Sequence, residues 1–273
     1  MTTAATHAIG SCRNQHTVAC GAVRFLFALV IAWAVVPAEA GSLAKGECSA
    51  PRPSTDLRHC SFAGQKFLAL DLHGADLSRV DFSNASLGKC DFIGANLRGA
   101  NFKWANLSDC LIRQADLTGA DLFHTRLDRA DLSGSKLSKA FLFGTDMSEI
   151  YADDVDLTGA HMKDVIMENA RMRRADLTGV YMLRGAILGS DLRWSKLIGV
   201  ELTGASAEGV NFSGADLTGA RLRGARLIEA LFIGANLKDV DIENAIFEQT
   251  DFRGAVHVPE FAAKRLGDKW RAN

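Results

Sequence analysis

The chain has 273 residues, among them 25 glycines and only 4 prolines, and its formal net charge at pH 7 is −1. This balance excludes a strongly basic or strongly acidic protein that binds its partners through net charge alone. The frequency of Gly, together with the monotonous return of Leu, Ala and Asp, indicates internal repeats rather than an ordinary globular composition.

A secretory signal peptide is predicted over residues 1–40. A basic stretch leads into the apolar run FLFALVIAWAVV at 25–36, and the small residues Ala38 and Ala40 follow that run. Twelve apolar residues are typical of a signal-peptide core and fall short of the roughly 20 that a membrane-spanning helix needs. We expect cleavage after Ala40 and export to the periplasm or the medium, with no integral membrane span left. An uncleaved anchor is the alternative.

Loss of the leader leaves four cysteines, which are Cys48, Cys60, Cys90 and Cys110. Thiols of an exported protein can oxidise, and an even number is compatible with disulfides without proving them. Residues 41–55 are irregular and are predicted to form an N-terminal linker or cap. A disulfide between Cys48 and Cys60 would pin this segment over the first repeats, and two free thiols are the alternative.

A five-residue period runs through residues 56–255 without interruption. Steps of five from Leu57 reach Phe252 in forty positions, of which 38 hold Leu, Phe, Ile or Met, and the other two hold Ala152 and Ala207. A helix needs apolar spacing near 3.6 and a flat strand needs a spacing of two. Each pentad is therefore predicted to be a structural unit of its own.

The other positions of the pentad divide into inward and outward slots. Two residues before the central position the chain usually carries a small or β-branched residue, which points to the same side in extended backbone. Two residues after it stands Gly, because 18 of the 20 glycines in 56–255 occupy that slot. Gly tolerates positive φ, so a sharp turn is predicted once per pentad.

Like residues recur at separations of twenty. The central positions 57, 77, 97 and onward to 237 are all Leu. This period predicts four pentads per coil and about ten coils stacked as parallel strands, with the right-handed connection that parallel strands prefer. Cys90 and Cys110 fall twenty apart in one inward slot, where buried free thiols are favoured over a disulfide.

The motif A(D/N)LXX resembles that of the pentapeptide-repeat proteins. It occurs here as ADLSR at 75–79, ANLRG at 95–99, ADLTG at 115–119 and 175–179, and ANLKD at 235–239. The resemblance covers about 200 residues. It implies an all-β fold, a right-handed quadrilateral parallel β-helix, and by itself it implies no function.

The C-terminal segment 256–273 is predicted to close the solenoid. The sequence VPEFAAKRLGDKW at 258–270 has the pattern of a short amphipathic helix with Phe261, Leu266 and Trp270 on its apolar side. An open solenoid end exposes its core and its strand edge, so a capping helix is expected there. Homodimerisation through this helix is the alternative.

The sequence offers little catalytic or metal chemistry. One outward ladder aligns polar side chains at intervals of twenty: Asp76, Asn96, Asp116, Lys136, Asp156, Asp176, Lys196, Asp216 and Asn236. We interpret it as a solvated face rather than as paired catalytic carboxylates, because it has no cleft and contains lysines. The group Cys48, His59 and Cys60 matches no standard zinc spacing. We expect no catalytic residues, no bound metal and no cofactor.

One outer side carries an unusual group of aromatic and apolar residues. We call it the aromatic patch, and its members are Trp104, Phe123, His124, Phe141, Phe143, His161, Tyr181 and Leu183. Exposed aromatic groups mark interaction surfaces, although a self-stabilising aromatic ladder is the alternative. A basic cluster borders the same coils and is expected to be solvated; it comprises Arg171, Arg173, Arg174, Arg184 and Arg193.

The sequence therefore favours a non-enzymatic exported solenoid that acts as a structural or protein-binding scaffold, with no nucleic acid as partner. A DNA-mimicking rod that protects gyrase is the alternative if the protein remains in the cytoplasm, and it follows only from the family resemblance. The net charge of residues 56–255, with 28 acidic and 23 basic side chains, is −5 and is mild for such a mimic. A carbohydrate-active β-helix enzyme is a further alternative.

Overall fold

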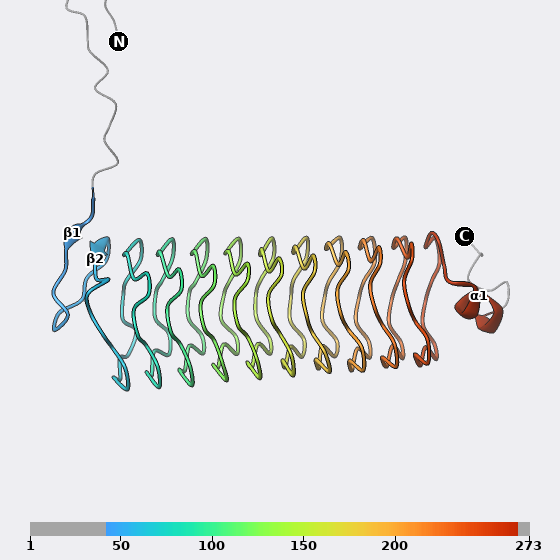
Figure 1. The fold of residues 1–273 in the computed structure, drawn as a ribbon, viewed down its shortest axis with the longest axis horizontal. Helices are drawn as coiled ribbons and strands as arrows, with labels where there is room; N and C mark the ends of the chain where they lie inside the picture. Colours follow the sequence, from blue (N-terminus) through green and yellow to red (C-terminus); the bar gives the residue numbers. More distant parts are fainter. Residues whose placement is uncertain (1–41, 267–273) are drawn as a thin grey trace, which may run out of the picture. The chain divides into compact units, whose positions relative to one another are not determined.

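A computed structural model describes residues 42–266 of the chain (Figure 1). The proposed signal peptide with its cleavage residues Ala38 and Ala40 lies outside the described residues, and so does Trp270. At the start, β1 (Ala44–Lys45) pairs in parallel with β2 (Thr55–Asp56). At the end stands one helix, α1 (Glu260–Leu266).

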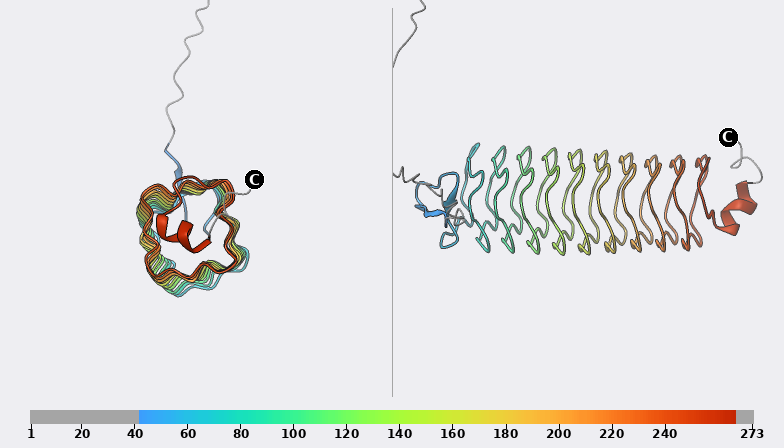
Figure 2. Two further views of the ribbon diagram at one scale, coloured as in Figure 1. Left: turned by 90° about the vertical axis from the view of Figure 1, so that its right-hand side faces the viewer. Right: turned by 90° about the horizontal axis from the view of Figure 1, so that it is seen from above.

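Between β2 and α1 the chain forms a parallel coil held by hydrogen bonds between residues about twenty apart. One-residue bridges run from Asp56↔Asp76 to Asn236↔Val256, always with a separation of twenty. Viewed along its axis, the coil has a four-sided outline (Figure 2). Each side therefore corresponds to one pentad, as the double period of five and twenty predicts.

The large and small inward residues fill a single continuous core. Phe62, Phe82 and Phe102 are fully buried and stack with ring centroids 5.2 and 5.0 Å apart. Burial of each such side chain contributes about 1.5–3 kcal/mol before conformational entropy is subtracted. The inward slots also accept Thr and Ser when the hydroxyl finds a carbonyl, as where Thr125 Oγ1 donates to Phe102 O at 2.7 Å.

One central position departs from the prediction. Phe67 is half-buried rather than buried, and Leu68 beside it is 86% exposed. The small inward slots on either side of Phe67 hold Gln65 and Leu70, which are too large for the interior. This side of the first coil is therefore less tightly packed, and Phe67 instead meets Phe62 edge-on at 5.7 Å.

The turn slot adopts positive φ with large side chains as well as with Gly. Gly119 has φ 67°, but Trp104 has 62° and His124 has 50° at the same slot. The left-handed conformation costs a non-glycine residue about 1 kcal/mol. The hydrogen bonds and core packing of the coil therefore impose the turn even where the side chain resists it.

A disulfide joins Cys48 to Cys60 and ties the segment after β1 to the first coil. Closing a loop of this length stabilises the folded state by about 3 kcal/mol in the chain-entropy account. Cys90 and Cys110 are free and buried, and the Cys110 thiol donates to Leu87 O at 2.9 Å.

The square coil predicts that whole coils are interchangeable and partial coils are not. Deletion of residues 156–175 brings Leu177 into the inward slot of Leu157, so a folded β-helix with cooperative unfolding is expected. Deletion of residues 156–162 brings Asp164 into that slot instead and buries a carboxylate in the core. Far-UV circular dichroism and urea unfolding distinguish the two variants, and equal tolerance of both deletions would contradict the coil register.

Candidate functional site: the aromatic patch

The aromatic patch occupies one side of successive coils, in three adjacent rows. Phe141, His161 and Tyr181 lie in the bridge row, where Phe141 pairs with His161 and His161 pairs with Tyr181. Phe123, Phe143 and Leu183 lie two residues further along their pentads, in the first turn position, and Trp104 and His124 lie in the positive-φ slot. The period of twenty therefore brings together residues from five successive coils.

Most rings of the patch contact the ring one coil away. The stacked pairs are Trp104 with His124, Phe123 with Phe143, and Phe141 with His161, at centroid distances of 4.4, 5.3 and 5.4 Å. Edge-to-face contacts join the first two stacks, since His124 meets Phe123 at 4.4 Å and Phe143 at 5.6 Å. Each such pair contributes about 0.5–1.5 kcal/mol beyond burial. The patch is therefore an ordered surface.

The stacked rings still present a large apolar surface to solvent. Trp104 is 57% exposed, Phe141 50% and Tyr181 40%. Lys163 places its Nζ 5.7 Å from the centre of the Phe143 ring. The patch thus exposes aromatic edges, and aromatic residues are enriched in protein interfaces.

Gly144 is a part of the patch that the sequence reading missed. A Cβ at Gly144 would lie 2.5 Å from Cε1 of His124, so the missing side chain makes room for that ring. Gly214 does the same for Trp194, whose Cδ1 would lie 2.6 Å from the added Cβ. The sequence carries a signal for this contact, because in both cases Gly stands twenty residues after a large aromatic residue of the same slot. Positive φ alone explains Gly in this slot, so the pattern does not by itself reveal the ring contact.

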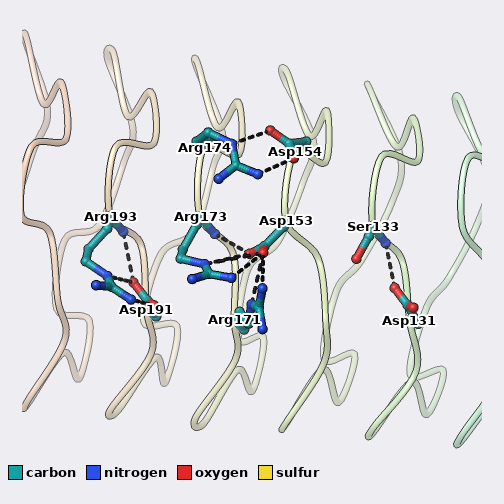
Figure 3. A network of polar contacts seen from close by, with 9 residues as sticks. All are labelled: Asp131, Ser133, Asp153, Asp154, Arg171, Arg173, Arg174, Asp191 and Arg193. Atoms are coloured by element: carbon teal, nitrogen blue, oxygen red, sulfur yellow. Dashed lines mark hydrogen bonds and ion pairs between the residues drawn. The ribbon is translucent and has the colours of Figure 1, made fainter.

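The basic cluster beside these coils is ion-paired, while its side chains remain partly exposed to solvent. Figure 3 shows Arg171 and Arg173 converging on Asp153, at 2.7 and 2.8 Å. Arg174 binds Asp154 at 2.5 Å, and its hydrogen bond lowers the pKa of that carboxyl. Arg184 pairs with Asp164 one coil away in the same way, whereas Arg193 pairs with Asp191 of its own pentad. Acidic side chains of the neighbouring coil or of the same pentad therefore neutralise the cluster.

The comparisons with known proteins agree with this geometry. Eight copies of the sequence model for pentapeptide repeats match the chain between residues 54 and 256. The chain belongs to the pentapeptide-repeat family. The right-handed quadrilateral β-helix of this family is accordingly the fold of the coil described above.

Two solved structures of pentapeptide-repeat proteins are similar. HetL, which is involved in heterocyst differentiation regulation in the cyanobacterium Nostoc sp. strain PCC 7120, is 28% identical, with a TM-score of 0.55 over 71% of this chain and 90% of HetL. QnrB1, a plasmid-mediated fluoroquinolone resistance protein, is 18% identical, with a TM-score of 0.36 over 76% of this chain and 94% of QnrB1. The search of curated protein sequences gave no match.

The carboxylate ladder of this pentapeptide-repeat protein supports the turns and is less solvated than expected. Asp76 is half-buried, and its Oδ1 accepts the N–H of Ser78 at 3.1 Å and the Asn96 side-chain amide at 3.0 Å. Asn236 bonds to Asp216 in the same way. Side chains of this kind satisfy backbone donors within the turn and so stabilise it.

The ligand atoms of Cys48, His59 and Cys60 lie within 4.8 Å of one another. The two sulfur atoms are bonded to each other in this structure, so neither is a thiolate ligand. Within residues 42–266, no helix is long and apolar enough to cross a membrane.

The contact between His124 and Gly144 can be tested with two alanine substitutions. Gly144→Ala and Gly159→Ala both place a Cβ at positive φ, at about 1 kcal/mol each, but the Cβ at 159 meets no atom within 4 Å. We expect Gly144→Ala to lower the free energy of unfolding by about 1 kcal/mol more, because the His124 ring loses its stack. Urea unfolding measures both, and equal losses would show that the ring does not depend on Gly144.

Proposed function

We propose that this pentapeptide-repeat protein is a non-enzymatic scaffold that binds another protein through the aromatic patch. The observation that carries the proposal is the exposure of Trp104, Phe141 and Tyr181 on one side of neighbouring coils. Exposed apolar groups of this size attract partners because association removes them from water. The ring stacks hold the surface in one arrangement, which lowers the entropy that binding must overcome.

The paired charges count against a DNA mimic. A mimic needs uncompensated carboxylates along its length, whereas arginines in several coils bind carboxylates one coil away, as Arg129 binds Asp109 at 2.9 Å and Arg221 binds Glu201 at 3.2 Å. The half-buried Asx turns count against a carbohydrate-active enzyme, since their carboxylates already accept backbone hydrogen bonds. The scaffold is therefore the function that the surface supports best.

We assign α1 the role of a cap on the last coil of about ten. Ala262 is fully buried, and the Phe261 ring lies 6.0 Å from the Phe247 ring, edge to face. In the end-on view α1 falls within the outline of the coil (Figure 2). Covering Phe247 and Phe252 shields the core end from water and from edge pairing. A homodimer through this end remains the competing assignment, and the oligomeric state in the next experiment tests it.

Serine substitution at the centre of the patch tests the partner proposal. The test variant carries Phe141→Ser and Phe143→Ser and so loses two rings of the patch. The matched control carries Tyr151→Ser and Trp194→Ser and loses two exposed rings on another side of the coil. We expect the first variant to lose a bound protein that the wild type and the control both retain, with circular dichroism unchanged. Pull-down from the protein's own compartment and light scattering measure binding and oligomeric state. Unchanged binding and oligomeric state in the first variant would end the patch assignment.

Export is proposed on the predicted signal peptide and is supported by the Cys48–Cys60 disulfide, because disulfides persist in oxidising compartments. Cell fractionation of the full chain and of a chain without residues 1–40 tests it. We expect the full chain in the periplasm or the medium and the shortened chain in the cytoplasm. The same cytoplasmic location for both, together with inhibition of gyrase, would favour the DNA mimic instead.

A further inference from the structure

A second surface feature lies at the N-terminal end of the coil. An open groove of about 900 Å³ lies there. It is lined by residues of β1 and β2 and by turn residues of the following coils, from Arg58 to Gly119. Its cationic lining comes from Lys45, Arg58, Arg79 and Arg98. It draws on different residues from the aromatic patch, so the inference below stands independently of the proposed function.

Two glycines make the floor of the groove. Gly99 and Gly119 occupy the same turn slot in successive coils. A Cβ at Gly119 would meet no atom within 4 Å, and a Cβ at Gly99 would meet only Cγ of Arg79, at 3.7 Å. The floor is therefore bare backbone, and the aliphatic part of Arg79 lies along it.

The groove contains positive charge that the protein does not neutralise. Arg58 is held by Asp56 at 2.6 Å, and Arg98 is held by Asp116 at 3.0 Å. Lys45 and Arg79 form no ion pair with any residue between 42 and 266. The balanced charge of the whole chain conceals this local excess, which attracts an anionic ligand.

We propose that this groove binds a linear acidic polysaccharide through its carboxylate groups. The guanidinium of Arg79 can bind a carboxylate with two parallel hydrogen bonds, and Lys45 supplies a second cation. The hydroxyls of Ser78 and Thr118 line the same groove; they bond to Asp76 and Asp116, and their oxygen lone pairs can still accept hydrogen bonds from the hydroxyls of a sugar. The lining residues come from successive coils about 4.8 Å apart, so the groove follows the coil axis and suits an extended chain.

The lining argues against a single-stranded nucleic acid, which carries the same kind of charge. Proteins that bind single strands place bases on Trp, Tyr or Phe rings. No residue of these three types lines the groove within the part of the chain that the structure describes. The groove is open to solvent and its floor is backbone, so a linear polysaccharide can lie along it.

Charge removal gives the first test, with the full-length purified protein and an oligogalacturonate as the probe. We expect isothermal titration calorimetry to detect binding that weakens as salt rises, and Lys45→Gln with Arg79→Gln to raise Kd by about tenfold or more, the effect of losing charge-assisted contacts. Lys238→Gln is the control. Lys238 lies in the same row as Arg98, far along the coil, and is exposed without an ion pair among residues 42–266. We expect its Kd to equal that of the wild type.

Filling the floor gives the second test. Gly119→Asn adds a side chain to the groove in a slot where Asn84 and Asn169 already adopt positive φ. We expect it to raise Kd by about tenfold, whereas Gly219→Asn, in the same slot five coils further on, leaves Kd unchanged. Circular dichroism and thermal unfolding of both variants verify that they fold alike.

Four results would overturn the proposal. The first is that the oligogalacturonate does not bind at millimolar concentration, and the second is that the groove variants and the control variants change Kd equally. The third is that inorganic phosphate, at the same total charge, displaces the bound oligogalacturonate as well as free oligogalacturonate does. The fourth is that a single-stranded oligonucleotide binds more tightly than the oligogalacturonate. The third would reduce the groove to an adventitious ion site, and the fourth would assign it to nucleic acid.

Discussion

The structure depends on the hydrogen bonds that join each residue to the coil before and the coil after it. Asn96 and Leu97 illustrate them, since the Asn96 N–H donates to Ala75 O in the coil before at 2.9 Å and the Leu97 N–H donates to Asp116 O in the coil after at 2.8 Å. These bonds fix a separation of about twenty residues, and a shift of one residue would turn every inward side chain outward. The ladder closes into a square because each pentad places a large residue and a small residue inward and then turns at positive φ.

Once the ladder is fixed, every side chain has a defined neighbour one coil away. This explains why charges, amides and rings on the surface interact at separations of eighteen or twenty, as in Arg184 with Asp164 and Phe123 with Phe143. A surface pair of this kind contributes little by itself in water. The rigid coil nevertheless holds both partners in place, so less side-chain entropy is lost when they meet.

The fold could be predicted from sequence because one period governs two hundred residues. The contacts within the patch could be predicted only in part. The residue number fixes the row and the coil in which each ring lies, but it does not fix the orientation of the ring. The fit of His124 over Gly144 and the pairing of Arg171 with Asp153 depend on side-chain conformations that no period specifies. The groove escaped sequence reading for another reason: it is formed partly by Lys45 and Asp56, which lie outside or at the edge of the repeat.

Regularity also explains where function can reside. A repeat such as ADLTG presents the same side chains on every coil, so it cannot by itself distinguish one site from the next. Specific recognition requires a local departure, and this chain has two kinds. The patch adds rings where the repeat has small or polar groups, and the groove places the cations Lys45 and Arg79, unpaired within residues 42–266, beside the glycine turns of the repeat. The first departure exposes apolar surface and the second exposes charge, so the two proposed sites offer surfaces of opposite chemistry on one rigid support.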